Sequence, residues 1–114
     1  SVWAEYENSC STLEFVERPI LGENALAISR IETHYFINNC FIDKNFILDN
    51  IHKIRHLPAI IIQGRHDVIC PPFNAINLSK KWEASEIQIV ENAGHSAFES
   101  DISRKIINAL HMIK

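Results

Sequence analysis

The feature that most constrains this 114-residue chain is a pair of short apolar runs in its second half. Residues 59–63 (AIIIQ) form a β-branched run that ends at Gly64, and residues 86–90 (EIQIV) form a second run. Such runs are typical of strands buried on both faces of a parallel sheet. A loop and a helical pattern follow each run, and the last helix is expected over residues 100–113. This order predicts a parallel pair joined by a right-handed crossover.

Two parallel strands are too few to form a stable sheet, because both faces and both edges of the pair stay exposed. The sequence therefore predicts an α/β chain whose two strands are the edge of a larger sheet. The remaining strands lie outside this chain or come from another molecule. An exposed edge of this kind also predicts self-association.

The first half of the chain, residues 1–56, shows helical patterns and no convincing alternation. One helix is expected over residues 24–39, with Asn24 as its N-cap, and another over residues 44–55. We therefore expect two parts, a helical segment followed by a βαβα segment over residues 57–114.

Charge and cysteine content exclude several classes of function. The formal net charge of −3 gives no broad basic face, so neither nucleic-acid binding nor membrane binding is expected. No apolar run has the length of a membrane span, and the first residues lack the layout of a signal peptide. Cys10, Cys40 and Cys70 are odd in number and lack a CxxC spacing, which predicts reduced thiols in a cytoplasmic protein.

Two residues with catalytic chemistry follow the predicted strands. Asp67 comes three residues after Gly64, and His95 comes five residues after the second strand. Functional groups of open α/β sheets collect beyond the carboxyl ends of the strands. There an Asp can accept a hydrogen bond from one ring nitrogen of a His and leave the other nitrogen free as a general base. The alternative is structural, with Asp67 as a turn former and His95 as a solvent-exposed side chain.

No metal or cofactor is expected from the sequence. His52 and His56 have the i, i+4 spacing of paired ligands on a helix, but no third ligand lies at a supporting spacing. There is no glycine-rich phosphate loop, so nucleotide binding has no support.

Four segments resemble the proline iminopeptidases, α/β-hydrolase-fold serine aminopeptidases that remove N-terminal proline. Residues 58–71 (PAIIIQGRHDVICP) are similar to the segment that bears the catalytic acid, and residues 93–96 (AGHS) to the histidine loop. Residues 27–36 (AISRIETHYF) and 3–7 (WAEYE) are similar to two segments of the helical cap, although Tyr6 stands where the family usually has Trp.

The resemblance implies the C-terminal part of an α/β-hydrolase, with a cap segment over residues 1–56 and the end of the core over residues 57–114. It implies that Asp67 and His95 are catalytic and that Glu7 and Glu32 bind the α-amine of a peptide with N-terminal proline. Carboxylates suit this role because they attract the ammonium and reject internal peptide segments. Tyr35 and Phe36 are expected to pack in the core, or alternatively to wall a pocket for the proline ring.

The chain contains no nucleophile of its own. The nucleophile elbow requires Gly-x-Ser-x-Gly, and the three glycines, at positions 22, 64 and 94, are too far apart to form it. Ser96 follows His95 and stands on the wrong side of the triad order. The isolated chain is therefore expected to be inactive.

Three functions stay open at this point. The chain is a C-terminal fragment of a proline iminopeptidase that works with the missing N-terminal half, a non-catalytic association module, or part of another α/β-hydrolase such as an esterase. The cap motif that contains Glu32 argues against the last of these.

Overall fold

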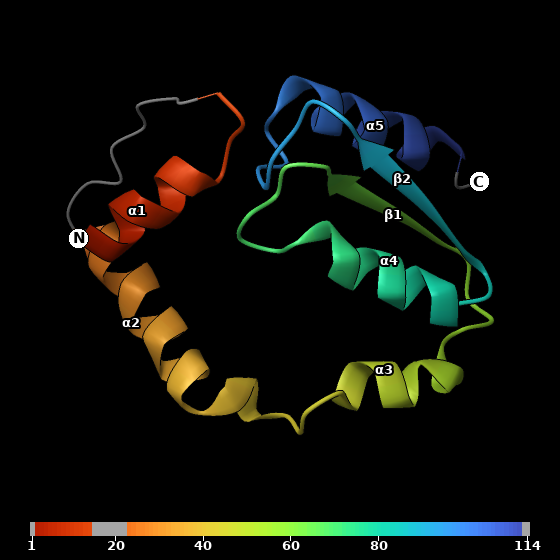
Figure 1. Ribbon diagram of the computed structural model, residues 1–114, viewed down its shortest axis with the longest axis horizontal. Coiled ribbons are helices and arrows are strands. Elements are labelled where there is room, and N and C mark those ends of the chain that lie inside the picture. The colour runs from red at the N-terminus through yellow and green to blue at the C-terminus, as the bar shows by residue number, and fades with distance from the viewer. Residues whose placement is uncertain (1, 15–22, 113–114) are drawn as a thin grey trace.

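The two strands form where the sequence predicts them. The computed structural model describes residues 2–14 and 23–112. Strands β1 (Ala59–Gly64) and β2 (Ser85–Val90) pair in parallel, with Ile61 opposite Ile87 (Figure 1). The predicted α/β class and the parallel pair are confirmed, and each strand is one residue longer than expected.

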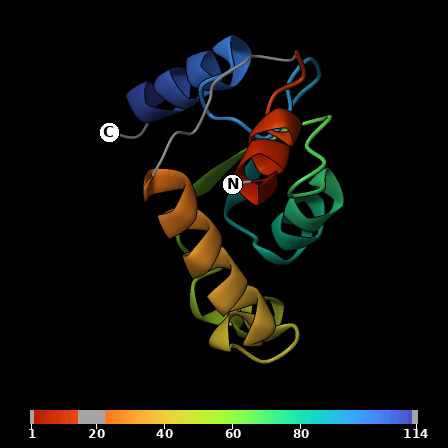
Figure 2. The ribbon, with the colours of Figure 1, turned by 90° about the vertical axis from the view of Figure 1, so that its left-hand side faces the viewer.

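Helices cover the two faces of this sheet. Helix α4 (Pro72–Lys81) connects the strands, and α5 (Ser100–Met112) follows β2. Figures 1 and 2 show the two helices on opposite sides of the strands. Proline at the first position starts α4 without the loss of a helical hydrogen bond. A small core forms between β2, its following loop and α5, and consists of Val90, Ala93 and Ile102 with Ile62 and Ile106 packed against them.

The first half of the chain forms an arm of helices that curves away from the sheet. Its elements are α1 (Val2–Cys10), α2 (Glu23–Ile37), η1 (Asn39–Phe41), α3 (Phe46–Asn50) and η2 (Ile51–Lys53). Figure 1 shows α1 and α2 side by side at one end of this arm, and α3 below α4 at the other. Among the described residues, no helix combines the length and the apolar character that crossing a bilayer requires.

The boundaries predicted for the first long helix were wrong at both ends. Helix α2 already includes Glu23, so Asn24 lies within the helix and is not its N-cap. The helix ends at Ile37 and not at residue 39. The left-handed conformation, which ends a right-handed helix, follows at three consecutive residues: Asn39 (φ 50°), Cys40 (φ 54°) and Phe41 (φ 58°).

The helix predicted over residues 44–55 is also shorter than expected. Asn45 has a φ of 66°, which delays the start of α3 to Phe46. The helix ends at Asn50, where the side-chain amide donates to the carbonyl of Phe46. This bond competes with backbone pairing, and the chain continues as the 3-10 turn η2.

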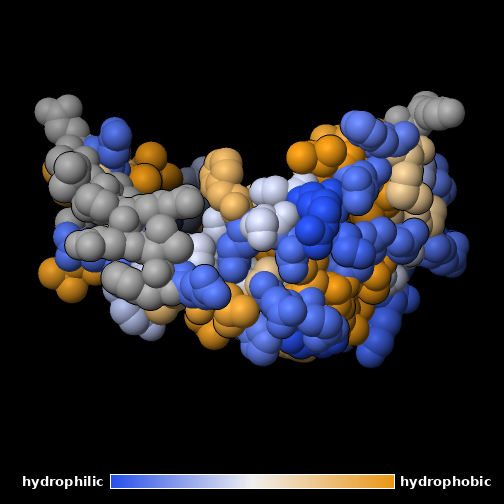
Figure 3. Space-filling view, turned by 90° about the horizontal axis from the view of Figure 1, so that it is seen from above, coloured by the Kyte–Doolittle hydropathy of each residue, from blue (hydrophilic) through white to orange (hydrophobic). Residues whose placement is uncertain are grey.

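The molecule is more open than a globular domain of its length. Its radius of gyration is 16.0 Å, whereas about 13 Å is expected for 114 residues. It exposes 8542 Å², against roughly 6,400 Å² for a compact monomer of 13.1 kDa. Side chains of β1 are half-buried, so the expected burial on both faces is not reached in this chain. Figure 3 shows apolar residues in several places on the surface of the molecule.

Candidate active site

Asp67 is held in place by the loop that follows β1. Its side chain is buried, and its Oδ1 accepts the backbone N–H groups of Ile69 (3.0 Å) and Cys70 (2.7 Å). These bonds close the turn on the carboxylate and fix its orientation. The other oxygen, Oδ2, therefore points away from the turn and toward the loop that follows β2.

His95 lies on that second loop, within hydrogen-bond distance of Asp67. Its Nδ1 is 3.0 Å from Oδ2 of Asp67, and its side chain is partly exposed. An ionised Asp67 accepts the hydrogen bond of Nδ1–H, which leaves Nε2 as the basic nitrogen. The arrangement can take a proton from a hydroxyl group and return it to a leaving group.

The two loops meet because Gly64 lets them approach. A Cβ atom at this position would collide with the carbonyl oxygen of Gly94 and would lie 2.7 Å from that of Ala93. The loop after β2 thus crosses directly over the end of β1. Backbone bonds fix the crossing, from N–H of Arg65 to the carbonyl of Val90 and from N–H of His66 to that of Ala93, each 2.9 Å.

Gln63 is a residue of this site that the sequence reasoning missed. Its Nε2 donates to Oδ2 of Asp67 at 3.1 Å, the oxygen that also faces His95. The same nitrogen lies 3.2 Å from the carbonyls of Gly64 and Cys70. The pattern of apolar and polar residues along β1 could not reveal this role. The side chain of Gln63 bonds to the loop beyond the strand, and that loop takes its position only in the folded chain.

Glu7 and Glu32 come together from two different helices. Glu7 lies on α1 and Glu32 on α2, and their carboxyl groups share a hydrogen bond. Indole Nε1 of Trp3 donates to Oε2 of Glu32 at 2.7 Å. Burial raises the pKa of Glu7, the neighbouring Glu32 raises it further, and His95 acts in the opposite direction. Glu7 also lines a pocket together with Val68 and Ile69, which directly follow Asp67, so it lies near the Asp67–His95 pair.

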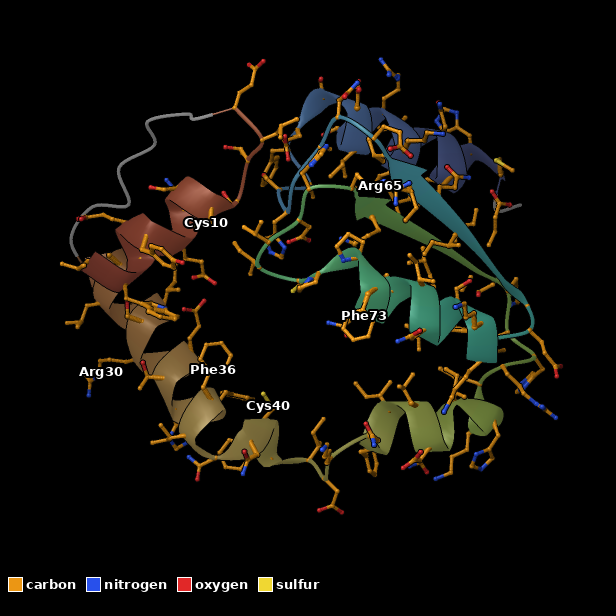
Figure 4. All side chains as sticks on the ribbon, in the orientation of Figure 1. Cys10, Arg30, Phe36, Cys40, Arg65 and Phe73 are labelled. Atoms are coloured by element: carbon orange, nitrogen blue, oxygen red, sulfur yellow. The ribbon has the colours of Figure 1, made fainter. Side chains whose placement is uncertain are left out.

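A pocket of about 270 Å³ lies beside Glu7. It is lined by Trp3, Tyr6, Glu7, Cys10, Phe36, Val68 and Ile69. Figure 4 shows Phe36 on the side of α2 that faces α4, whereas Arg30 points away from it. Tyr35 does not line this pocket and contacts Phe41 at 5.3 Å between ring centroids. Both aromatic residues are about half exposed, so the expectation that they pack in the core was wrong.

The remaining histidines do not join this site. Nδ1 of His52 lies 3.0 Å from the carbonyl oxygen of Asp49, and His66 stays exposed. Within residues 2–14 and 23–112, no group of three or more His, Cys, Asp or Glu side chains has the geometry to hold a metal ion.

Comparison with known proteins identifies the relatives of this chain, although no family model matches it. It is 40% identical over 117 residues to the proline iminopeptidase of Arabidopsis thaliana, 98% of this chain and 31% of that protein. It is 39% identical over 115 residues to that of Neisseria gonorrhoeae, 97% of this chain and 36% of that protein. It is 37% identical over 112 residues to that of Xanthomonas citri, 94% of this chain and 36% of that protein.

The chain is homologous to the C-terminal third of proline iminopeptidases. The resemblance read from its sequence is thereby confirmed. The chain spans about a third of the length of these proline iminopeptidases.

Proposed function

We propose that this chain supplies the acid–histidine pair and the amine-binding carboxylates of a proline iminopeptidase. The observation that carries the proposal is geometric: His95 bonds to Asp67, and Glu7 lines a pocket together with Val68 and Ile69, the two residues that follow Asp67. In this proposal Nε2 of His95 takes the proton of a serine hydroxyl as its oxygen attacks the carbonyl carbon of the first peptide residue. The same nitrogen then gives that proton to the leaving amine.

The carboxylate pair accounts for selection of a free N-terminus. Burial raises the pKa of Glu7, and the neighbouring carboxyl group of Glu32 raises it further, because two negative charges placed side by side repel each other. A substrate ammonium supplies a positive charge that both carboxylates can bind. The pocket beside Glu7, with Trp3 and Phe36 in its wall, offers an apolar surface to the pyrrolidine ring of proline.

The serine has to come from polypeptide outside these 114 residues, because no Gly-x-Ser-x-Gly occurs among them. Residues 1–56 would then form part of the cap and residues 57–114 the end of the hydrolase core of a cytoplasmic peptidase. Glu32 favours this assignment over an esterase, since an ester substrate offers no ammonium to bind.

The test is hydrolysis of L-proline p-nitroanilide by the purified chain, alone and after co-expression with the N-terminal two thirds of a relative. We expect no hydrolysis by the chain alone, and hydrolysis by the mixture that His95→Ala abolishes. Glu32→Gln should weaken cleavage of the proline anilide and leave cleavage of p-nitrophenyl acetate unchanged. Hydrolysis by the chain alone that His95→Ala abolishes would contradict the requirement for an outside serine.

Association is a second function that a specific observation favours. The chain exposes roughly 2,100 Å² more than a compact monomer of its mass, the area of a sizeable protein interface. In the described residues β1 pairs with β2 alone, which leaves one edge of β1 without a strand. We expect this edge to bind the remaining strands of a hydrolase or a second copy of the chain. A strictly monomeric mass at high concentration, with a cooperative melt, would contradict this expectation.

A further inference from the structure

We propose that Glu99 is a positioning residue that couples the segment carrying Glu7 to the loop carrying His95. The inference deepens the proposed function, since it concerns how the amine-binding and proton-transferring groups keep their separation. It rests on a junction of four hydrogen bonds, three of which join residues more than 80 positions apart in sequence.

The carboxylate of Glu99 bridges two backbone donors from different segments. Oε1 accepts N–H of Gly94 at 2.7 Å, and Oε2 accepts N–H of Leu13 at 3.1 Å. Gly94 directly precedes His95, and Leu13 follows α1 by three residues. One carboxylate therefore ties the histidine loop to the chain that leaves α1.

A second pair of bonds makes the same connection in parallel. The carbonyl of Ser11 accepts N–H of His95 at 2.9 Å and N–H of Ser96 at 2.7 Å. A Cβ atom at Gly94 would lie 3.2 Å from Oε1 of Glu99 and 3.3 Å from both the backbone N of Leu13 and the carbonyl oxygen of Ser11. The junction thus closes around Gly94, and Figure 1 shows the chain after α1 beside the turn that precedes α5.

Helix capping does not account for this side chain. Glu99 directly precedes α5, and its backbone carbonyl accepts N–H of Ser103 as the first bond of the helix. A capping carboxylate turns toward N–H groups of its own first turn. Here both oxygens face the opposite way and bind Gly94 and Leu13.

The junction bears on the active site because Glu7 is one helical turn before Ser11. Helix α1 packs on α2, which belongs to the arm and not to the sheet. The junction at Ser11 and Leu13 therefore fixes where Glu7 stands relative to His95. If it opens, the ammonium of a bound substrate is no longer held at a fixed distance from the basic nitrogen.

Amide hydrogen exchange, measured by NMR on the full chain, tests the coupling. Glu99→Gln keeps the size of the side chain, but its amide cannot accept both N–H groups. Loss of a charged acceptor should speed exchange of Gly94 and Leu13 about 10- to 100-fold. If the junction opens as one unit, exchange of the His95 and Ser96 amides should speed up as well, although these amides bind Ser11 and not Glu99. Exchange in β2 should stay unchanged.

Glu14→Gln is the matched control, because it makes the same charge change one residue beyond Leu13, on an exposed side chain. It should leave all four junction amides unchanged. If Glu99→Gln speeds amide exchange only at Gly94 and Leu13, the proposal is overturned. Glu99 would then stabilise only the two amides that it binds. If Glu99→Gln does not fold, Glu99→Asp provides the test, since its shorter side chain keeps the charge but cannot span both donors.

Binding of L-prolinamide separates this inference from the proposed function. The ligand should bind the parent chain and shift the side-chain carboxyl signal of Glu7, and Glu99→Gln should weaken its affinity about 5- to 10-fold. No binding to the parent chain would count against the proposed function, while the exchange experiment still decides the coupling. Unchanged affinity in Glu99→Gln would overturn the coupling alone.

Discussion

Nδ1 of His95 lies 3.0 Å from Oδ2 of Asp67, and the Asp67 side chain is only 5% exposed. Both N–H groups of the turn occupy Oδ1, so the carboxylate cannot rotate without losing them. The His95 ring is thereby oriented by a group that is itself fixed. This geometry determines which ring nitrogen carries the proton, and that can be measured without any substrate.

Asp67→Asn should move this proton to the other ring nitrogen. The Asn oxygen must stay at the position of Oδ1 to accept N–H of Ile69 and Cys70, which turns its NH₂ group toward His95. An NH₂ group donates to Nδ1, so the ring carries its proton on Nε2 and loses its base. We expect ¹⁵N imidazole shifts to report Nδ1–H in the parent chain and Nε2–H in the variant. Hydrolysis by the complemented enzyme should fall on the order of 10³- to 10⁴-fold. Retention of Nδ1–H in the variant would contradict the side-chain orientation that the N–H groups of Ile69 and Cys70 are expected to impose at position 67.

Gln63→Leu should loosen the turn that holds Asp67. The substitution removes a donor shared among Asp67, Gly64 and Cys70, and should cost about 1–3 kcal/mol because one acceptor is charged. Urea denaturation measures this change. Gln88→Leu on β2 is the control, since the side chain of Gln88 bonds only to exposed Glu86 among the contacts described, and should cost less than about 0.5 kcal/mol. Equal losses in the two variants would show that Gln63 has no special role.

The sequence predicted the parts of this molecule that depend on local pattern. The β-branched run before Gly64 and the apolar face of the last helix each specify one element, and parallel strands bring their carboxyl ends together. Asp67 and His95 each follow the carboxyl end of a strand, and this accounts for their proximity. The roles of Gln63 and Glu99 could not be predicted, because their partners are backbone groups whose positions exist only after folding.

The left-handed turn after α2 was unpredictable for a different reason. Its residues, Asn39, Cys40 and Phe41, include no glycine to signal a positive φ. Aromatic contacts maintain it, since Phe41 lies 5.3 Å between ring centroids from both His34 and Tyr35. Tertiary packing thus overrides local preference at this position.

Cys40→Gly should stabilise the chain, because Cys40 has a φ of 54°. Removal of the Cβ atom relieves about 1–2 kcal/mol of strain, and the added freedom of the unfolded chain offsets about 0.4–1 kcal/mol of this. We expect a net gain of about 0.5–1 kcal/mol in the urea-derived free energy of unfolding. Cys10→Gly, in the last turn of α1, should destabilise the chain instead. A loss of stability in Cys40→Gly would show that the thiol makes a compensating contact.

Glu7→Gln should stabilise the chain at neutral pH and not in acid. Burial and Glu32 raise the pKa of Glu7 above 4.5, so the folded chain binds a proton more readily than the unfolded chain. The stability linked to that proton is fully present below pH 4.5 and is lost as the pH rises through the folded-state pKa. Gln keeps a donor to Glu32 at every pH. We expect Tm to rise at pH 7. The difference should vanish below pH 4.5, and a constant difference across pH would contradict the raised pKa of Glu7.

Gly64→Ala and Gly94→Ala should differ sharply in their cost to stability, although each adds one methyl group where the loop after β2 crosses the end of β1. At Gly64 the added Cβ atom meets two backbone carbonyls, of Ala93 and Gly94, which cannot move without breaking the crossing of the loop over β1. At Gly94 it lies 3.2 Å from the side chain of Glu99, which can rotate, and 3.3 Å from backbone atoms. We expect a cost of about 3 kcal/mol or more at Gly64 and about 1 kcal/mol at Gly94, measured by urea denaturation. Gly94→Ala should also speed amide exchange at Leu13, because displacement of Glu99 opens the junction. Similar costs at the two positions would mean that the loops do not approach as closely as the structure has them.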